Sequence, residues 1–313
     1  MKPCPAITIV AALFAAFTLN IQPAAQADTF GTSGNEFTID FVNIGNAGNA
    51  ADTTTYGAVP YDYRVGKYEI TQDAITRATL SGMTNVTAGP WTSNQPAATI
   101  NWYEAAAFVN WLNTSTGKTA AYNLAFSGSW SMTLWSSEQA WTAGGTNLYR
   151  NKDAFYFLPS ENEWYKSAYY NPAGSDYFRY PTASSSVPTA VASGTGAGTA
   201  VYDQPFGGPA GVDSAGGLSP YGTMGQGGNV FEWNESAFDG SNSSSSEDRA
   251  VRGGGWFSDE FFLRASVRYF DPPAVEGDYI GFRVASVPEP STYVLVLMGA
   301  GALYLWKRRK GSL

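Results

Sequence analysis

The sequence predicts one large domain that combines short strands with a few helices and much irregular structure. Three observations lead to this prediction. Residues 28–286 are long enough to bury a substantial core as a single unit. Alternating apolar residues indicate strands, and polar capping residues indicate where helices begin. The 34 glycines supply the positive φ angles and close backbone approaches that irregular segments need.

Strand signals come first along the chain. Residues 37–42 read Phe-Thr-Ile-Asp-Phe-Val and alternate between apolar and polar side chains, which is typical of a half-buried strand. Residues 45–57 are rich in glycine, asparagine and threonine and predict a loop, and residues 61–70 predict a second extended stretch. A short helix is expected to begin at Thr71 and to end near Gly82.

Two further helices have explicit start signals. Asn101 precedes a helical apolar pattern and is followed three residues later by Glu104, which predicts a capping box. Ser160 and Glu163 have the same spacing, and the Asn-Pro pair at 171–172 predicts the end of that helix. We therefore interpret both glutamates as cap partners rather than as catalytic acids.

The first residues have the composition of a secretory signal peptide. Lys2 is followed by an apolar stretch over 6–19, and Ala25-Gln26-Ala27 fits the small-residue cleavage pattern. The sequence thus predicts a signal peptide over 1–27 and a mature chain that begins at Asp28. The one cysteine, Cys4, belongs to the signal peptide.

The last residues combine three signals. They are Val287-Pro288-Glu289-Pro290-Ser291, an apolar run over 292–306, and the basic block Lys307-Arg308-Arg309-Lys310. Clustered cations resist transfer across a bilayer, so this pattern predicts a C-terminal transmembrane helix with a cytoplasmic basic tail. The run is shorter than the roughly 20 residues of a full span, and the alternative is a buried core helix.

Residues 287–313 closely resemble the PEP-CTERM sorting signal of Gram-negative bacteria, with residues 287–291 as its signature. The resemblance implies that an exosortase recognises and cleaves the protein during export. It also implies a location at the cell surface or in the extracellular matrix, with at least transient anchoring in the membrane through residues 292–306.

Composition excludes several kinds of chemistry. Residues 28–286 contain 13 Lys and Arg against 25 Asp and Glu, a net charge of −12, which argues against nucleic acid as a partner. The same residues contain neither cysteine nor histidine. Disulfides, thiolate catalysis, Cys/His zinc sites, histidine-bound iron and a Ser-His-Asp triad are therefore excluded.

Aromatic residues are numerous, with 10 Trp, 19 Tyr and 18 Phe. One interpretation is that large rings fill the core of a loop-rich domain, because each of them buries a large area. The other is that some Trp and Tyr faces stack on sugars. The sequence favours the first interpretation and leaves the second open.

Five clusters of glycine, tryptophan and polar residues follow one another along the chain. They cover residues 96–102 with 110–112, 158–164, 228–233, 252–256 and 281–284. Together they resemble the formylglycine-generating enzyme family, also called the sulfatase-modifying-factor domain, over residues 37–286. The resemblance implies a single α+β domain of the C-type-lectin-like kind, with little regular secondary structure.

Three arginines of the C-terminal half lie in apolar surroundings. They are Arg264, Arg268 and Arg283, and we expect them to pair with buried acids such as Glu232 or Asp271. The alternative is a cluster of arginines that binds an anion.

The resemblance implies calcium at residues 228–232. The carbonyls of Gly228 and Val230 and the carboxylate of Glu232 are hard oxygen ligands that suit Ca²⁺. The family has Asp or Asn three positions before the Gly-Asn pair, whereas this chain has Gly225. Calcium at this site and a structural ion pair of Glu232 both remain open.

The family's redox site is degenerate in this sequence. The resemblance implies copper held by two cysteines after the Arg-Gly-Gly cluster, but Ser258 stands near the first position and apolar residues stand near the second. A hydroxyl cannot replace a thiolate as a ligand of Cu(I), and the iron-dependent branch of the family needs histidines. We therefore expect neither copper nor iron. Asp259 and Glu260, beside Ser258, are the remaining candidate acids and more often form a solvated face.

These observations lead to one main hypothesis and two alternatives. The main hypothesis is an exported protein whose domain, over 28–286, is a non-catalytic binding or structural module of an exopolysaccharide or biofilm matrix. The first alternative is an enzyme with a divergent, cysteine-independent activity, which predicts a pocket near Ser258 that holds a carboxyl with a shifted pKa. The second is a purely structural coat protein, which predicts no pocket there.

Overall fold

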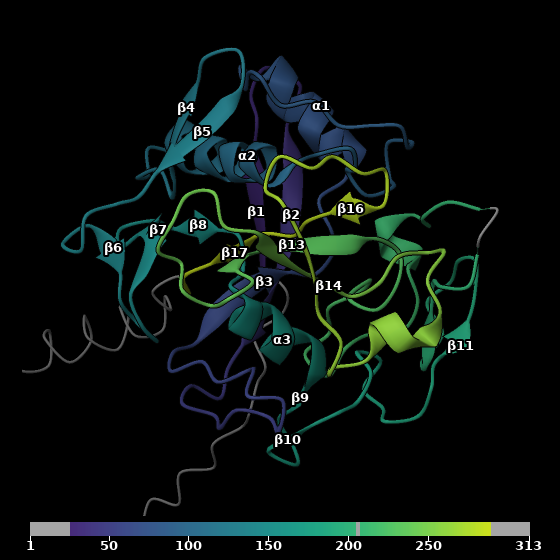
Figure 1. The fold of residues 1–313 in the computed structure, drawn as a ribbon. Helices are drawn as coiled ribbons and strands as arrows, with labels where there is room; N and C mark the ends of the chain where they lie inside the picture. The colour runs from purple at the N-terminus through teal and green to yellow at the C-terminus, as the bar shows by residue number, and fades with distance from the viewer. Residues whose placement is uncertain (1–25, 205–206, 289–313) are drawn as a thin grey trace, which may run out of the picture.

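The computed structural model describes residues 26–204 and 207–288, which form an α+β domain of short elements (Figure 1). Its largest sheet has five antiparallel strands. In spatial order they are β1 (Gln26–Phe30), β2 (Phe37–Ile44), β3 (Tyr63–Gly66), β17 (Ala285–Ser286) and β8 (Tyr156–Phe157). The last strand of the described range thus lies between an early strand and one from the middle of the chain.

The second sheet has four strands and includes residues of the clusters at 228–233, 252–256 and 281–284. In spatial order they are β15 (Tyr269–Asp271), β14 (Arg249–Arg252), β13 (Phe231–Ala237) and β16 (Ile280–Gly281). The pair β13–β16 is parallel, and the other two pairs are antiparallel. Figure 1 shows β13 and β14 near the centre of the molecule.

The other strands form four pairs. They are β4 (Asn123–Phe126) with β5 (Trp130–Thr133), β6 (Ala140–Trp141) with β7 (Asn147–Asn151), β9 (Tyr170–Asn171) with β10 (Asp176–Tyr177), and β11 (Thr189–Ala190) with β12 (Thr199–Ala200). Two short 3-10 turns, η1 (Val212–Ser214) and η2 (Glu260–Leu263), lie in the C-terminal half.

The three α-helices begin where the sequence predicts. They are α1 (Gln72–Leu80), α2 (Trp102–Ser115) and α3 (Glu161–Tyr169). Both predicted capping boxes are confirmed, because the cap side chain and the glutamate bond each other's backbone at Asn101–Glu104 and at Ser160–Glu163. Figure 1 shows α1 and α2 together at the top of the view and α3 below β13.

One predicted boundary is wrong. The stretch predicted to be extended over 61–70 is a strand only at Tyr63–Gly66, because residues 67–70 make single hydrogen bonds to Asp40 and Phe282 instead of a ladder. Helix α3 ends at Tyr169, just before the Asn-Pro pair as predicted, and Tyr170 is extended and pairs in β9 with β10.

Large rings fill the core, as the sequence favoured. Trp102, Trp164 and Trp233 are completely buried. Other aromatic side chains are exposed, however, and most of these belong to residues 257–270: Phe257, Phe261, Tyr269 and Phe270. Exposed rings that gather in one region usually mark a binding surface.

No helix in residues 26–204 and 207–288 is long and apolar enough to cross a membrane. The predicted transmembrane helix over 292–306 and residues 1–25 of the predicted signal peptide lie outside the described residues. Ala27, where the signal peptide is predicted to end, lies in β1 and pairs with Asp40 of β2.

Candidate functional site

The glycine cluster at 253–255 forms the turn that organises the candidate site. Gly253 and Gly254 have φ angles of 102° and 78°. Residues with a Cβ adopt such positive φ angles only at a cost in free energy. A Cβ on Gly254 would lie 3.0 Å from Leu263 Cδ1, so the missing side chain also lets η2 pack against the turn. Trp256 is buried and donates its backbone N–H to the carbonyl of Asn229 at 2.8 Å. The turn is thereby tied to the cluster at 228–233.

Ser258 lies in a pocket of about 600 Å³. Its side chain is buried, and its Oγ accepts the backbone N–H of Gly255 at 3.0 Å. Its carbonyl accepts the N–H of Asp203 at 2.8 Å. The structure therefore places Ser258 in the wall of a cavity, held there by these two backbone hydrogen bonds. A purely structural coat protein was expected to lack such a pocket.

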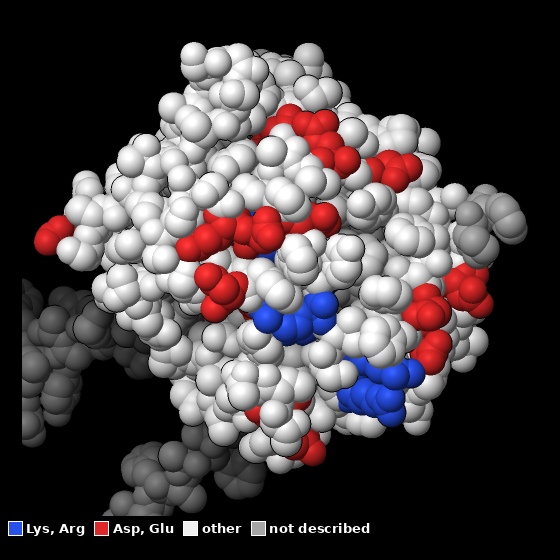
Figure 2. Space-filling view, in the orientation of Figure 1, with Lys and Arg blue, Asp and Glu red and all other residues white. Residues whose placement is uncertain are grey.

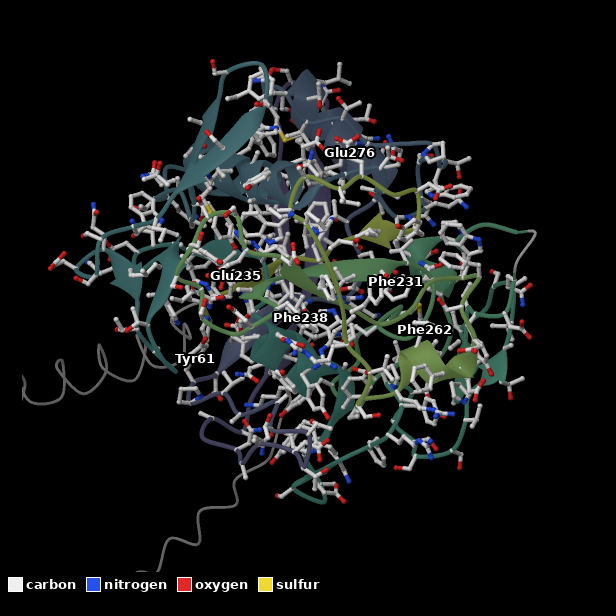
Figure 3. The ribbon with its side chains drawn as sticks, viewed as in Figure 1. Tyr61, Phe231, Glu235, Phe238, Phe262 and Glu276 are labelled. Carbon is white, nitrogen blue, oxygen red and sulfur yellow. The ribbon has the colours of Figure 1, made fainter. Side chains whose placement is uncertain are left out.

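Five aromatic side chains line this pocket: Phe231, Phe257, Phe262, Tyr269 and Tyr279. Phe231 forms the floor, since it is 8% exposed and its ring centroid lies 6.0–6.5 Å from those of the other four. The walls are open to solvent, with Phe257 43% and Tyr269 50% exposed. Figure 3 shows Phe231 beside β13 and Phe262 below it at η2.

Three carboxylates, Asp203, Asp259 and Asp271, complete the lining. Asp259 caps η2 by accepting the N–H of Phe261, and its neighbour Glu260 pairs with Arg264. Figure 2 shows acidic side chains at the top, across the middle and at the right edge of this face, and basic side chains mainly in two patches. The predicted solvated acidic pair thus borders the pocket.

Asp271 has a pocket carboxyl with one unpartnered oxygen. Its Oδ2 atom is buried and has no hydrogen-bond partner. Burial raises the pKa of Asp271, and the nearby Asp248 carboxylate raises it further. Its cross-strand neighbour Arg249 does not neutralise it, because that guanidinium bonds Tyr149 and the carbonyl of Glu247.

The expected pairing with buried acids is confirmed for Arg268 and Arg283 and is wrong for Arg264, whose partner Glu260 is 37% exposed. Arg283 pairs with Glu232, as expected. Arg268 pairs with Glu161, and no arginine in the described residues pairs with Asp271, which lies on the outer strand β15. These guanidinium groups bind carboxylates of the protein itself, so the geometry does not favour the alternative of an anion-binding cluster.

Glu232 is completely buried and bound through both oxygens. Arg283 donates from Nε to Oε2 and from Nη2 to Oε1, each at 2.6 Å, and Trp164 Nε1 donates to Oε2 at 2.7 Å. A calcium ion at Gly228, Val230 and Glu232 would have to displace a bidentate arginine. The side chains present therefore do not fit calcium at Glu232, and the geometry favours the ion pair. In the described residues, no three His, Cys, Asp or Glu side chains are grouped as a metal site.

A thermal titration with calcium tests this arrangement. Extracellular calcium sites have dissociation constants of about 10⁻⁴–10⁻³ M, so about 10 mM calcium would stabilise a protein that has one. With the ion pair intact, we expect the melting temperature to be the same with calcium as with an equal ionic strength of sodium chloride. A calcium-specific increase that Glu232→Gln abolishes would support the calcium site instead.

Glu69 was not foreseen from the sequence, and it occupies the space left by Gly225. A Cβ on Gly225 would lie 2.6 Å from Glu69 Oε2. Glu69 is buried, its Oε1 accepts from Asn229 Nδ2 at 3.0 Å, and its Oε2 has no partner. Its carboxyl therefore fills the space beside Gly225, where the resemblance implies an Asp or Asn side chain. No local signal could have revealed this, because the two residues are distant in the sequence.

The stability of the domain should fall as the pH rises through the titration of Glu69. Burial, together with the Glu232 carboxylate, raises the pKa of Glu69 from 4.5 to about 8. Between pH ~5 and pH ~8 the unfolded chain has lost this proton while the native state keeps it, so increasing pH favours unfolding. We expect a slope of up to about 1.4 kcal/mol per pH unit from this group. Urea unfolding at several pH values measures it, and Glu69→Gln should remove the contribution; an unchanged slope in that variant would contradict the assignment.

Comparison with known families explains these clusters. Residues 25–287 match the family of the sulfatase-modifying factor enzyme 1-like domain. The chain belongs to this family. The family match spans the strands, the helices and the pocket of the sulfatase-modifying-factor-like domain. Residues 286–310 match the PEP-CTERM protein-sorting motif, which confirms the second resemblance.

Solved structures share the fold at low sequence identity. Treponema denticola variable protein 1 has a TM-score of 0.59 and 20% identity, over 84% of this chain and 99% of its own. CarF has a TM-score of 0.56 and 16% identity, over 80% and 99%. PvdO from Pseudomonas aeruginosa has a TM-score of 0.51 and 16% identity, over 83% and 98%. No curated protein sequence matches this chain.

The structure brings some of the predicted site residues together and separates others. Ser258 lines the pocket, whereas Glu232 lies buried against Trp164 and Arg283. The sorting residues Pro288 and Val287 end the described range, and residues 289–291 lie outside it. Phe231 and Asp271, which shape the pocket, were not predicted as site residues of the sulfatase-modifying-factor-like domain.

Proposed function

We propose that this protein is an exported binding module whose sulfatase-modifying-factor-like domain holds an exopolysaccharide of the extracellular matrix in the pocket at Ser258. The observation that carries the proposal is the pocket itself. It is open, its floor is Phe231, and its walls include the exposed rings of Phe257 and Tyr269. Exposed rings around a cavity are costly in water and favour a ligand that covers them.

The redox chemistry of the family has no support in this chain. Residues 28–286 contain neither the thiolates that hold copper nor the imidazoles that hold iron. The Ser258 hydroxyl, which stands near the first cysteine position of the family, already has a hydrogen-bond partner, since its Oγ accepts the N–H of Gly255. The proposed binding therefore requires neither metal.

A retention assay tests the proposed function. The exported protein, purified from cells, is passed over immobilised native exopolysaccharide, and we expect it to be retained. Phe257→Ala should reduce retention about tenfold or more, because it removes an exposed wall of the pocket. The matched control is Phe126→Ala on β4, since Phe126 is 44% exposed and Phe257 is 43% exposed. No retention of the unaltered protein, or equal losses in the two variants, would contradict the proposal.

One observation favours a second function, an enzyme without metal or cysteine. The pocket contains Asp271, a carboxyl whose pKa burial raises, and such a group can act as a general acid or base. This function predicts that bound exopolysaccharide is cleaved or modified over time and that Asp271→Asn stops the change. Chromatography of the eluted polysaccharide distinguishes turnover from binding alone.

The sorting motif supports the location that we propose. A PEP-CTERM motif implies processing by an exosortase and association with the cell envelope. We further propose that residues 292–306 anchor the protein at least transiently, that it reaches the Gram-negative cell surface or matrix, and that its domain is of the C-type-lectin-like kind. Short strands and few helices support the last of these.

A further inference from the structure

The charge of the pocket lining selects among ligands. Its nine lining residues include three aspartates and neither lysine nor arginine. The body around it is acidic as well, with a net charge of −12 over residues 28–286. An anionic ligand, such as a uronic acid or a sulfated sugar, would be repelled at short range and over the whole approach. A neutral or cationic ligand is favoured.

The arrangement of rings favours a cation. The faces of aromatic rings carry negative charge density and attract an ammonium group within about 6 Å of the ring centroid. Phe231, Phe257 and Tyr279 pack against one another with centroid separations of 5.7–6.5 Å, and Phe257 remains 43% exposed at the pocket. A cation beside the exposed rings of Phe257 and Tyr269 would lie in a partly desolvated site, where the attraction is stronger.

One carboxylate lacks the donor that such a cation would supply. Asp271 Oδ2 is buried without a hydrogen-bond partner, which is unfavourable for a carboxylate. Asp271 also lines the pocket, so a protonated amine there, which carries donors and a positive charge, would give this carboxylate a charge-assisted hydrogen bond. A neutral hydroxyl could supply the hydrogen bond but not the charge.

The size of the pocket favours a sugar ring over a simple ammonium ion. About 600 Å³ lies in the range of sites for small organic ligands, and it exceeds what an ammonium group alone would fill. The exposed faces of Phe257 and Tyr269 can pack against the apolar C–H faces of a pyranose. The ligand that satisfies both requirements is a sugar that carries a free amino group.

We propose that the pocket binds the protonated amino group of an amino sugar in the matrix exopolysaccharide, with Asp271 as its hydrogen-bond acceptor and the exposed rings of Phe257 and Tyr269 beside it. This inference rests on the proposed function and names the class of sugar that the binding module selects. De-N-acetylated hexosamine units have this chemistry, whereas their N-acetylated forms are neutral.

Calorimetry with a matched pair of ligands tests the inference. The probes are a β-1,4-linked glucosamine trimer and the same trimer fully N-acetylated, each titrated into the exported protein near pH ~6, where an amine is protonated. We expect the glucosamine trimer to bind at least about tenfold more tightly, and Asp271→Asn to remove about that factor. The control is Asp153→Asn, because Asp153 is an exposed acid, paired with Lys152, outside the pocket lining. Near-UV circular dichroism checks that each variant is folded, and Phe257→Leu provides a second pocket variant that keeps the core intact.

The outcomes separate this inference from the proposed function. Equal affinity for the two trimers, or an effect of Asp153→Asn as large as that of Asp271→Asn, would overturn the amino-sugar assignment while native exopolysaccharide is still retained. Binding of a lysine-rich peptide without binding of either trimer would overturn it too, and would indicate a protein partner. Failure of native exopolysaccharide to be retained at all contradicts the proposed function itself.

Discussion

Arg150→Met should lower the free energy of unfolding by about 3–5 kcal/mol, because it leaves two buried carboxylates without their shared cation. Arg150 is completely buried, and its Nη2 atom lies 2.8 Å from Glu163 and 2.6 Å from Glu235. Its guanidinium also stacks 3.7 Å from the ring centroid of Phe157. Methionine keeps much of the volume and removes the charge, so the variant isolates the electrostatic effect.

The free energy of unfolding that Arg150→Met loses should be larger at high pH. Burial raises the pKa of both carboxyls, and Arg150 lowers both. At Glu163 the cation prevails, with help from the backbone N–H of Ser160, and the pKa lies below its ordinary value. At Glu235 burial prevails, and the pKa lies above it. Without Arg150 both acids should bind protons more readily in the native state. The substitution therefore lowers the free energy of unfolding most at pH values at which both glutamates of the unfolded chain are ionised.

Urea unfolding measures this effect. Arg77→Met is the control, because Arg77 pairs with Asp73 at the surface and its side chain is 38% exposed; we expect it to cost less than about 1 kcal/mol. Combining Arg150→Met with Glu163→Gln and Glu235→Gln should recover part of the loss, since the uncompensated charges are gone. If the triple variant is no more stable than Arg150→Met, the buried carboxylates are not the cause.

Gly228→Ala should destabilise the domain by about 3 kcal/mol or more. Gly228 has a φ of 83°, where a residue with a Cβ costs about 1–2 kcal/mol, and overpacking adds about 1–3 kcal/mol. The added Cβ would lie 2.1 Å from the carbonyl oxygen of Val201, a backbone atom that cannot turn aside. The clash would also disturb the bond from Asn229 N to that oxygen, which links the motif to residues 200–201.

A second glycine separates the clash from the backbone conformation. Gly222 has a similar φ of 92°, but a Cβ there would meet nothing within 4 Å. Gly222→Ala should therefore cost only about 1–2 kcal/mol. Thermal unfolding of the two variants gives the difference. Equal losses of stability in the two variants would show that the clash with Val201 does not add to the destabilisation by Gly228→Ala.

Patterns of a few neighbouring residues predicted where the helices begin, but they did not predict contacts between residues far apart in the sequence. Asn101 with Glu104 and Ser160 with Glu163 are three residues apart, so the sequence alone shows both partners of each cap. Glu163 has a second role that spacing cannot show, because the side chain also binds Arg150. Buried ion pairs of this kind join segments whose approach is decided by the whole fold.

The pocket is a second feature that depends on contacts between distant residues, and its lining could not be predicted from the sequence. The resemblance marked Ser258 as a degenerate position, and the structure places it in a cavity. The floor and the acceptor of that cavity come from β13 and β15, which meet through β14 rather than through neighbouring sequence. The abundance of aromatic residues suggested either a core or a sugar surface. The structure contains both aromatic rings that fill the core and a group of exposed aromatic rings. The folded structure is needed to tell which ring belongs to which group.

Hydrogen exchange of the exported protein, with and without native exopolysaccharide, tests most directly whether the pocket is where this domain acts. Binding there should slow amide exchange in residues 255–262 and 269–271, and leave the β4–β5 hairpin at 123–133 unchanged. Protection confined to that hairpin or to other surfaces, or no protection at a concentration that retains the protein, would contradict the account.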